Sequence, residues 1–180
     1  MQNKSYQFTL VLKNVDANTP DLEDSLYEAG CDDALICYRN GAVYLEFDRE
    51  AASLEDAVIS AINNVKSAPI DMDIASIAPE NLVTESEIAK RLKMPRQTVS
   101  LWIKGERREG FPPPIMRLSE KSPLWQWDEV AKWLFKHKIT VDQQLVDDAL
   151  FFANINAVLG ELDKNTKKER HHLLDRMEAH

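Results

Sequence analysis

The dipeptide Asn40-Gly41 is the feature that most restricts how this chain can fold. It stands between two short segments, DALICYR and AVYLEF, that are rich in β-branched, aromatic and other apolar residues. Asparagine followed by glycine accepts the positive φ angles of a type I′ turn, whose twist matches that of two paired antiparallel strands. The sequence therefore predicts a β-hairpin over residues 33 to 48.

The segments around this hairpin complete a unit of the α+β class. Residues 6 to 13, YQFTLVLK, and residues 70 to 78, IDMDIASIA, alternate between apolar and polar side chains as strands do. A segment with helical spacing of its apolar residues lies on each side of the hairpin. The resulting order of strand, helix, strand, strand, helix and strand is the ferredoxin-like βαββαβ arrangement, which we expect over residues 1 to 79.

Capping residues place the two helices of this N-terminal domain. Thr19 can cap the first helix and Pro20 can occupy its first turn, and Gly30 should end it. Ser53, which is followed by two acidic residues, should cap the second helix. The inner faces are expected to carry Leu22, Leu26 and Tyr27 in the first helix, and Leu54, Ala57, Val58, Ala61, Ile62 and Val65 in the second.

The stretch SEIAKRLKMPRQTVSLWIKG, residues 86 to 105, predicts a second unit. Its apolar residues keep a helical period, lose it for three residues and then resume it. Thr84 and Glu87 have the spacing of a capping box that starts the first helix. A turn at residues 93 to 95 separates it from a second helix, Arg96 to Lys104, so the pair forms a helix-turn-helix. The inward side of the second helix is expected to carry Val99, Trp102 and Ile103.

The chain after Gly105 predicts a wing and a further helix. GERREGFPPP is too rich in glycine and proline for regular structure, whereas IMRL and LWQW predict two short strands joined by a turn over SEKSP. Asp128 should then cap a helix. The apolar side of that helix is expected to carry Val130, Trp133 and Leu134.

This middle segment resembles a known family of DNA-binding proteins. In IAKRLKMPRQTVSLWIKG, the spacing Ile-Ala-x-x-Leu, a three-residue turn and Thr-Val-Ser-x-Trp resembles the helix-turn-helix regulators of bacteria and their phages. FPPPIMRLSEKSPLWQWDEVAKWL resembles the wing and following helix of the excisionase-like and MerR-like groups. The resemblance implies a winged helix-turn-helix that binds double-stranded DNA, over residues 80 to 138. Lys93 departs from the family, which usually has glycine there, and a positive φ would cost lysine about 1 kcal/mol.

The charge of the chain changes sign along its length. The formal net charge is −8, but residues 1 to 80 carry 5 basic and 15 acidic side chains, a balance of −10. Residues 81 to 138 carry 12 and 7, a balance of +5, and residues 139 to 180 carry 5 and 8, a balance of −3. A polyanion is attracted to the middle segment and repelled by the other two, so an acidic chain can still bind DNA.

The outward side of the second helix carries the candidate DNA contacts. Arg96 and Gln97 have side chains that form bidentate hydrogen bonds with the edges of guanine and adenine, and we expect them to read bases. Ser100 shares this side of the helix. Thr98, Lys104, Arg107 and Arg108 are expected to hold phosphates, and Arg117 or Lys121 of the wing to reach the backbone or the minor groove.

The C-terminal segment, residues 139 to 180, is expected to be helical and to mediate dimerisation. A helix from about Val141 to Leu162 carries a wide apolar face that requires a partner surface. It packs on the two small domains or pairs with a second copy of the chain, and residues 164 to 180 are polar and expected to fray. The apolar face comprises Leu145, Val146, Leu150, Phe151, Ile155, Val158, Leu159 and Leu162.

No group of residues predicts catalysis, a metal site or a cofactor. The four histidines are scattered, and no cysteine or carboxylate joins them at the spacing of a metal site. Cys31 and Cys37 fit no metal motif and are expected to be reduced thiols of a cytoplasmic protein that lacks a signal peptide and a membrane span. Asp32 and Asp33 stand at a strand entry, where turn capping is commoner than catalysis. We therefore expect a protein that is not an enzyme.

Three functional hypotheses follow. The first is a sequence-specific transcriptional regulator of bacterial or phage type that binds an inverted repeat as a homodimer. The second is an antitoxin-type interaction module whose acidic N-terminal domain binds a basic protein and whose DNA binding is autoregulatory. The third, ligand sensing by the N-terminal domain, rests on fold analogy alone. The tryptophans of the wing segment could also stack on single-stranded bases, although their spacing favours packing inside the domain.

Overall fold

The fold belongs to the α+β class and divides into two compact units. The computed structural model describes residues 3 to 162 and 164 to 178, apart from the side chains of residues 162, 164 to 169 and 178. Unit 1 comprises Met1–Pro79 and Asn154–His180, and unit 2 comprises Glu80–Ala153. The C-terminal segment, residues 139 to 180, is thus divided, because its long helix begins in unit 2 and ends in unit 1.

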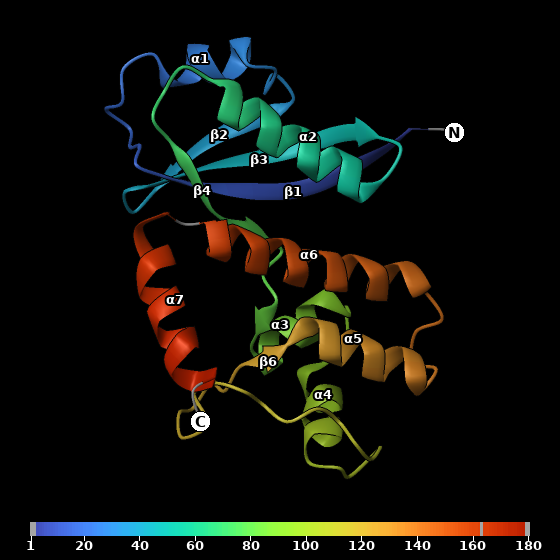
Figure 1. Ribbon diagram of the computed structural model, residues 1–180. Coiled ribbons are helices and arrows are strands. Elements are labelled where there is room, and N and C mark those ends of the chain that lie inside the picture. Colours follow the sequence, from blue (N-terminus) through green and yellow to red (C-terminus); the bar gives the residue numbers. More distant parts are fainter. Residues whose placement is uncertain (1–2, 163, 179–180) are drawn as a thin grey trace. The chain divides into compact units, whose positions relative to one another are not determined.

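A four-stranded antiparallel sheet forms the centre of unit 1 (Figure 1). Its strands are β1 (Lys4–Lys13), β2 (Ala34–Arg39), β3 (Ala42–Ala51) and β4 (Asp73–Ala78), in the spatial order β2-β3-β1-β4. The predicted hairpin is confirmed: β2 pairs with β3, and Asn40 and Gly41 take φ angles of 52° and 82° between them. Both angles are positive, as a type I′ turn requires.

Two helices, α1 (Leu22–Glu28) and α2 (Leu54–Ser67), cover one face of this sheet (Figure 1). The predicted cap of α2 is confirmed, since the Asp56 amide donates a 3.0 Å hydrogen bond to Ser53 Oγ. The predicted cap of α1 is wrong. Thr19 Oγ1 instead accepts a hydrogen bond from the Asp16 amide in the preceding turn, and Asp21 stands at the N-cap. Tyr27, expected to face inward, is 68% exposed, because this short helix buries only the side on which Leu22 and Leu26 lie.

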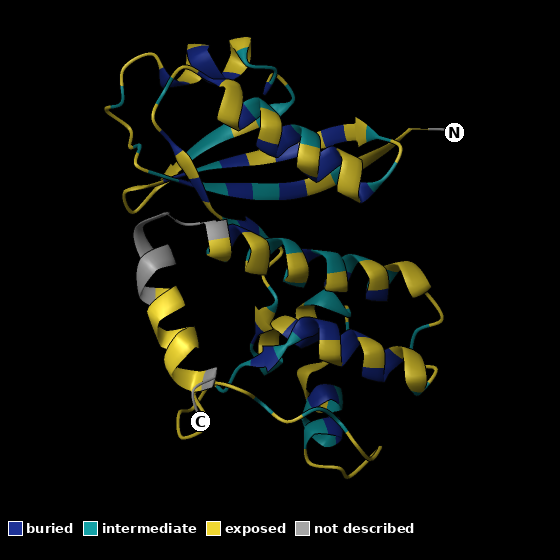
Figure 2. Ribbon diagram, in the orientation of Figure 1, coloured by how far each residue is buried: buried dark blue, intermediate teal, exposed yellow. Residues whose placement is uncertain are grey.

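The core of unit 1 follows directly from strand alternation (Figure 2). Alternate residues are buried beneath the helices from Phe8 to Leu12 in β1 and from Val43 to Arg49 in β3, and the rings of Phe8 and Phe47 stack with centroids 5.1 Å apart. The intervening positions face the other way and form rows across the sheet. One such row crosses all four strands and consists of Leu35, Glu46, Thr9 and Ala78.

A buried arginine links the elements at one end of this core. Arg49 is 8% exposed, and its Nε and Nη2 donate 2.7 Å hydrogen bonds to the two carboxylate oxygens of Asp33. Its guanidinium also donates to the carbonyl of Gly30 at 2.8 Å and to Ser60 Oγ at 3.1 Å. The hydrogen bonds to Asp33 raise the pKa of Arg49 despite its burial. Asp33, expected to cap a turn, therefore serves as the partner of a buried cation.

The C-terminal part of the chain contributes two helices, α6 (Gln143–Leu162) and α7 (Lys164–Glu178). Asn156 of α6 covers the outer edge of β4: its side chain accepts a 2.8 Å hydrogen bond from the Ile77 amide and donates a 2.9 Å hydrogen bond to the Ile77 carbonyl. A side-chain amide thus takes the place of a neighbouring strand. The expectation that residues 164 to 180 fray is wrong as far as Glu178, where α7 ends; residues 179 and 180 lie outside the described part of the chain.

The apolar face predicted for α6 is buried only in part. Val146 packs into the core of unit 2 and Leu159 is buried in unit 1, whereas Leu150 and Val158 are 39% and 46% exposed. Val141, expected to begin the helix, precedes it and is 87% exposed. The side chain of Leu162 lies outside those described. None of the helices in the described ranges has the length and apolar character needed to cross a membrane.

Unit 2 surrounds a core dominated by tryptophans. Its elements before α6 are β5 (Leu82–Val83), α3 (Glu85–Arg91), α4 (Arg96–Ile103), β6 (Trp125–Gln126) and α5 (Trp127–Lys136). The largest members of its core are Trp102, Trp125, Trp127 and Trp133, none more than 7% exposed. Val130 and Leu134, predicted with Trp133 for the apolar side of α5, are fully buried.

The two-stranded hairpin expected for the wing is formed only in part. IMRL contributes a single bridge, Met116 to Leu124, and β6 pairs instead with β5, which precedes the helices. The three prolines before Ile115 lack amide hydrogens to donate to a neighbouring strand, and Arg117 takes a φ of 55°, so strand pairing does not extend on either side of the bridge.

The start of α5 also differs from the prediction. Gln126 stands at the N-cap, and Asp128, expected there, lies within the first turn. Its carboxylate accepts a 2.8 Å hydrogen bond from Asn81 Nδ2, and its amide donates a 2.9 Å hydrogen bond to Asn81 Oδ1. Asp128 therefore joins α5 to the chain that enters β5.

Candidate nucleic-acid interface

The first helix of the candidate interface, α3, is fixed at its start by the predicted capping box. The Glu87 amide donates a 3.3 Å hydrogen bond to Thr84 Oγ1, and the Thr84 amide donates a 2.6 Å hydrogen bond to Glu87 Oε2. This backbone amide holds the pKa of the Glu87 carboxyl below its usual value. Two amides that the first turn cannot satisfy internally are therefore occupied.

A sharp turn connects α3 to α4. Lys93 takes a φ of 52°, as expected for the position where the similar family usually has glycine. The turn is closed by hydrogen bonds from the Lys93 amide to the Lys90 carbonyl at 3.1 Å and from the Met94 amide to the Ala89 carbonyl at 3.0 Å. These bonds hold a lysine in a conformation that costs about 1 kcal/mol.

The inner side of α4 is fixed by the core. Val99 is fully buried and Trp102 is 3% exposed, and the ring of Trp102 lies 5.4 Å from that of Trp133 in α5. Ile103, predicted to face inward with them, is half-buried against the same core. These contacts fix the rotation of α4 about its own axis and thus determine which side chains point outward.

The outward side of α4 presents the polar residues expected there. Arg96, Gln97 and Lys104 are exposed, and Thr98 and Ser100 are half-buried. The side chains that we expected to read bases therefore lie near the first turn of an exposed helix face, and Lys104 lies at the other end.

Arg96 has a protein partner that the sequence reading did not identify. Its Nε lies 3.2 Å from Glu85 Oε1, with the two side chains 64% and 23% exposed. An ion pair this exposed is worth at most about 1 kcal/mol, so DNA can displace it at little cost. Glu85 nevertheless orients the guanidinium along α3 when no ligand is bound. The two partners lie in different helices, 11 residues apart, so no helical spacing in the sequence predicts this ion pair.

Two tryptophan side chains hold the Gly- and Pro-rich loop that follows α4. Trp133 Nε1 donates a 3.1 Å hydrogen bond to the Glu109 carbonyl, and Trp125 Nε1 donates one of 3.1 Å to the Pro112 carbonyl. Phe111 from the loop packs edge-on against Trp133, with ring centroids 4.9 Å apart. The tryptophans therefore organise the loop from within. Because their rings are buried, they are not available to stack on bases.

Several basic residues of the middle segment are engaged with the protein itself. Arg108 donates a 3.0 Å hydrogen bond to the His137 carbonyl, at the end of α5. Arg91 donates a 2.8 Å hydrogen bond to the Glu80 carbonyl and lies over the ring of Trp127, and its burial lowers its pKa. Arg107, beside Arg108, is exposed. The excess of positive charge counted from the sequence is thus only partly available to a ligand.

The wing residues Arg117 and Lys121 lie in an exposed turn. Arg117 Nε is 4.0 Å from Glu120 Oε2, with both side chains at least half exposed, and Lys121 is exposed. The same turn carries three exposed apolar side chains that the sequence reading missed: Ile115, Met116 and Leu118. The predicted strand over IMRL gave no indication that these three side chains are exposed. The run of prolines just before them was the available signal against a strand.

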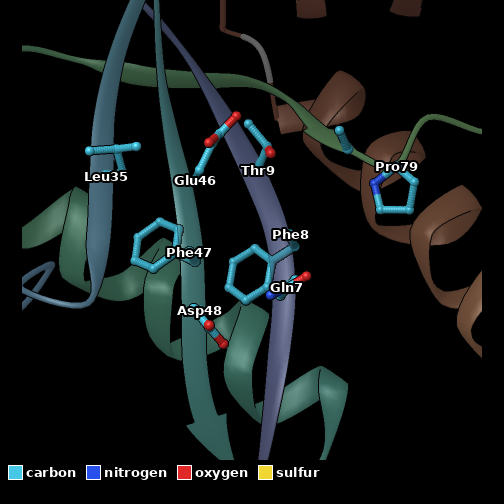
Figure 3. A pocket seen from close by; sticks show the side chains of 9 residues that line it. Gln7, Phe8, Thr9, Leu35, Glu46, Phe47, Asp48 and Pro79 are labelled. Carbon is cyan, nitrogen blue, oxygen red and sulfur yellow. The ribbon is translucent and has the colours of Figure 1, made fainter.

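Unit 1 has a hollow of about 530 Å³ on its sheet. Figure 3 shows its side chains, including the stacked rings of Phe8 and Phe47 and the carboxylates of Glu46 and Asp48. No lysine, arginine or histidine lines it, so it has no side chain that attracts a phosphate. The candidate DNA contacts predicted from the sequence, residues 96 to 121, all belong to unit 2.

The chemistry of the remaining residues adds no second site within the described part of the chain. No three His, Cys, Asp or Glu side chains there come together as metal ligands. Cys31 is buried, which raises its pKa to about 11, and Cys37 is half-buried; both are free thiols. A thiol with so high a pKa is almost entirely protonated near neutral pH and is a poor nucleophile.

Comparison with known proteins adds no relative. No protein-family model matches the chain, and no curated protein and no solved structure matches it.

Proposed function

We propose that this protein is a sequence-specific transcriptional regulator that binds double-stranded DNA through unit 2. In this proposal, unit 2 is a winged helix-turn-helix, α4 is its recognition helix in the major groove, and unit 1 is a ferredoxin-like domain. The observation that carries the proposal is the two-sided character of α4. Val99 and Trp102 fix its inner side, while Arg96, Gln97 and Lys104 project from its outer side.

The side chains of α4 divide into two roles. Arg96 and Gln97, at the start of the helix, have the donor and acceptor patterns that recognise guanine and adenine edges. Lys104, Thr98 and Ser100 bind phosphates of the DNA backbone. Arg107 extends this set along the loop, and Arg108 contributes its charge from the position fixed by His137.

A homodimer would let two copies of α4 read an inverted repeat. The outward side of α6 carries Leu150 and Val158, which are 39% and 46% exposed and eight residues apart in one helix. Leu150 belongs to unit 2 and Val158 to unit 1, and each is an exposed apolar side chain that a second copy would bury. Light scattering of the full chain should give twice the chain mass, and a Leu150→Asp, Val158→Asp variant should give the mass of one chain.

Base reading and phosphate holding predict different effects of mutation. The test uses a duplex that the full-length protein selects from a random-sequence library, together with a scrambled duplex of the same composition. Arg96→Ala should lose about 1 to 3 kcal/mol on the selected duplex and far less on the scrambled one. Lys104→Ala should weaken both similarly and lower the slope of log K against log salt by about one unit.

Exposed basic residues of unit 1 provide matched controls. Arg39→Ala and Lys66→Ala remove one positive charge each from exposed positions outside unit 2, and neither should change discrimination between the two duplexes. If Arg96→Ala weakens both duplexes by the same factor, then α4 does not read sequence. Failure of the full-length protein to select any duplex would refute the proposed function itself.

A further inference from the structure

A cluster of apolar side chains stands exposed in the turn between Met116 and Leu124. Ile115 and Met116 are each 47% exposed and Leu118 is 67% exposed. Single exposed apolar residues are normal on a protein surface, but three within four consecutive positions form a patch. We refer to residues 115 to 122 as the wing tip.

Backbone hydrogen bonds give the wing tip a defined shape. The Leu124 amide donates a 3.0 Å hydrogen bond to the Met116 carbonyl, and the Ile115 amide donates one of 2.8 Å to the Leu124 carbonyl. Beyond this bridge, the Glu120 amide donates a 3.0 Å hydrogen bond to the Arg117 carbonyl. Leu118 therefore occupies a central position of a β-turn formed by residues 117 to 120.

The fold of unit 2 does not use these side chains. Its core is filled by the four tryptophans and by aliphatic residues of the helices. Six partly buried apolar side chains pack against that core, and none of them comes from the wing tip: Leu92, Met94, Ile103, Phe111, Ile139 and Leu145. The exposed apolar surface of the wing tip therefore needs a reason other than folding.

Basic residues flank this apolar patch. Arg117 immediately precedes Leu118, and Lys121 follows three residues after it; both are exposed. The acidic Glu120 lies 4.0 Å from Arg117, but the two side chains are 50% and 65% exposed, so a phosphate can replace it at little cost. Leucine, methionine and isoleucine beside basic side chains match the wedges that architectural proteins insert between base pairs from the minor groove. The cations bind the phosphates at the edges of the groove, and the apolar side chain replaces stacking that the kink removes.

We propose that the wing tip inserts Leu118, supported by Met116, between two base pairs from the minor groove and kinks the bound DNA. This inference rests on the proposed function, because it requires unit 2 to bind duplex DNA. It adds a physical consequence that base reading by α4 does not entail. The bound duplex is bent, and its sequence preference includes an easily unstacked pyrimidine–purine step where the wing tip lies.

The experiment measures bending and unstacking separately from affinity. The probe is a duplex selected by the full-length protein from a random-sequence library and labelled at its two ends for energy transfer. A second version carries 2-aminopurine within the segment that the protein protects from cleavage. Binding of the full-length protein should shorten the distance between the ends, corresponding to a kink of about 20° to 90°, and should increase 2-aminopurine fluorescence at one step.

Two variants and a matched control distinguish the wedge from a general surface effect. Leu118→Ala and Met116→Ala should each remove at least half of the change in energy transfer, and Leu118→Ala should abolish the 2-aminopurine signal. Val141→Ala truncates an apolar side chain of the same unit that is 87% exposed and outside the wing tip, and it should leave both signals unchanged. Because all three side chains are exposed, the variants should keep the tryptophan fluorescence of the folded protein.

The possible failures are distinct. If the protein selects no duplex, the proposed function fails and the wedge fails with it. If the wild-type protein binds a selected duplex tightly but leaves it straight and fully stacked, DNA binding stands and the wedge is refuted. If Leu118→Ala retains full bending, the kink has another origin and the wing tip is refuted as its cause; its apolar patch would then fit a protein partner.

Discussion

The two units of this protein bury their cores by different means. Unit 1 uses the alternation of strands and the periodicity of helices, with aliphatic residues and one stacked phenylalanine pair. Unit 2 has short helices and an irregular loop, and it relies on four tryptophans whose rings fill the core. In a fold built from regular elements, the backbone amides and carbonyls form their hydrogen bonds within those elements. A fold with a long irregular segment needs side chains that both fill space and supply hydrogen bonds.

The use of polar side chains in the interior follows the same contrast. In unit 1, Arg49 gathers Asp33, Gly30 and Ser60 around one buried cation. In unit 2, the indole groups of Trp125 and Trp133 donate to loop carbonyls, and the buried carboxylate of Asp128 accepts a hydrogen bond from Asn81. A neutral donor avoids the desolvation cost of a buried charge, whereas a cation can satisfy more partners at once.

The largest effect is expected from Trp133→Ala. This substitution removes a core ring, its contacts with Trp102 and Phe111, and the hydrogen bond to Glu109. The free energy of unfolding of unit 2 should fall by about 3 to 5 kcal/mol. All four tryptophans of the chain lie in unit 2, so urea unfolding followed by the fluorescence of the remaining three reports on that unit alone.

Trp133→Phe is the matched control for this substitution. It keeps an aromatic ring in the core but removes the donor, so the loss should be clearly smaller and should include about 1 kcal/mol for the hydrogen bond. Hydrogen exchange should accelerate in the loop around Glu109 in this variant. Equal losses for the alanine and phenylalanine variants would mean that the ring contributes little and would break the contrast between the units.

The next effect is expected from Arg49→Met in unit 1. Methionine fills a similar volume but leaves the Asp33 carboxylate without its buried partner, which should cost about 3 kcal/mol. Hydrogen exchange measured by mass spectrometry should rise in the peptides of β2 and β3. Arg39→Met, at an exposed position in the same sheet, is the control and should change stability by less than about 0.5 kcal/mol. A stability equal to that of wild type would show that the cation network is dispensable.

A smaller effect is expected at the start of α3. Thr84→Ala should lower the stability of unit 2 by about 1 kcal/mol at neutral pH, because it removes the capping side chain.

The pKa of Glu87 is lowered in the folded protein, so the stabilisation that its carboxylate provides is present above the pKa of an unfolded glutamate, about 4.3, and is lost as the pH falls through the folded value. The difference in the free energy of unfolding between Glu87→Gln and wild type, measured by tryptophan fluorescence, should therefore become smaller below about pH 4. A gap independent of pH would contradict the capping role of the carboxylate.

The smallest effect, and the one of opposite sign, is expected at Lys93. Lys93→Gly relieves a φ of 52° and should raise the stability of unit 2 by up to about 1 kcal/mol, less the entropy that glycine adds to the unfolded chain. Lys90→Gly, in the body of α3, should instead lower stability by about 1 kcal/mol. If both substitutions lower the free energy of unfolding measured in urea, the backbone at Lys93 is not strained.

The elements that depend on local chemistry were predictable from the sequence. The hairpin at Asn40-Gly41 and the capping box at Thr84 each depend on a few neighbouring residues, whose preferred backbone angles and hydrogen bonds are fixed by their own structure. The positive φ at Lys93 was expected only from the resemblance to helix-turn-helix regulators, because lysine itself disfavours that conformation. Strand alternation likewise predicted β1, because a period of two follows from the backbone alone.

The pairings between distant residues were decided only by the tertiary structure. The sequence predicted that IMRL and LWQW pair with each other as a hairpin, but a single bridge from Met116 to Leu124 joins them, and β6 pairs with β5, more than forty residues earlier in the chain. In the same way, Asp33 meets Arg49, Arg96 meets Glu85 and Asn156 meets the edge of β4. These partners are chosen by which buried or unpaired groups the packing of whole elements brings together. Their separation along the chain leaves no periodic signal from which a contact can be read.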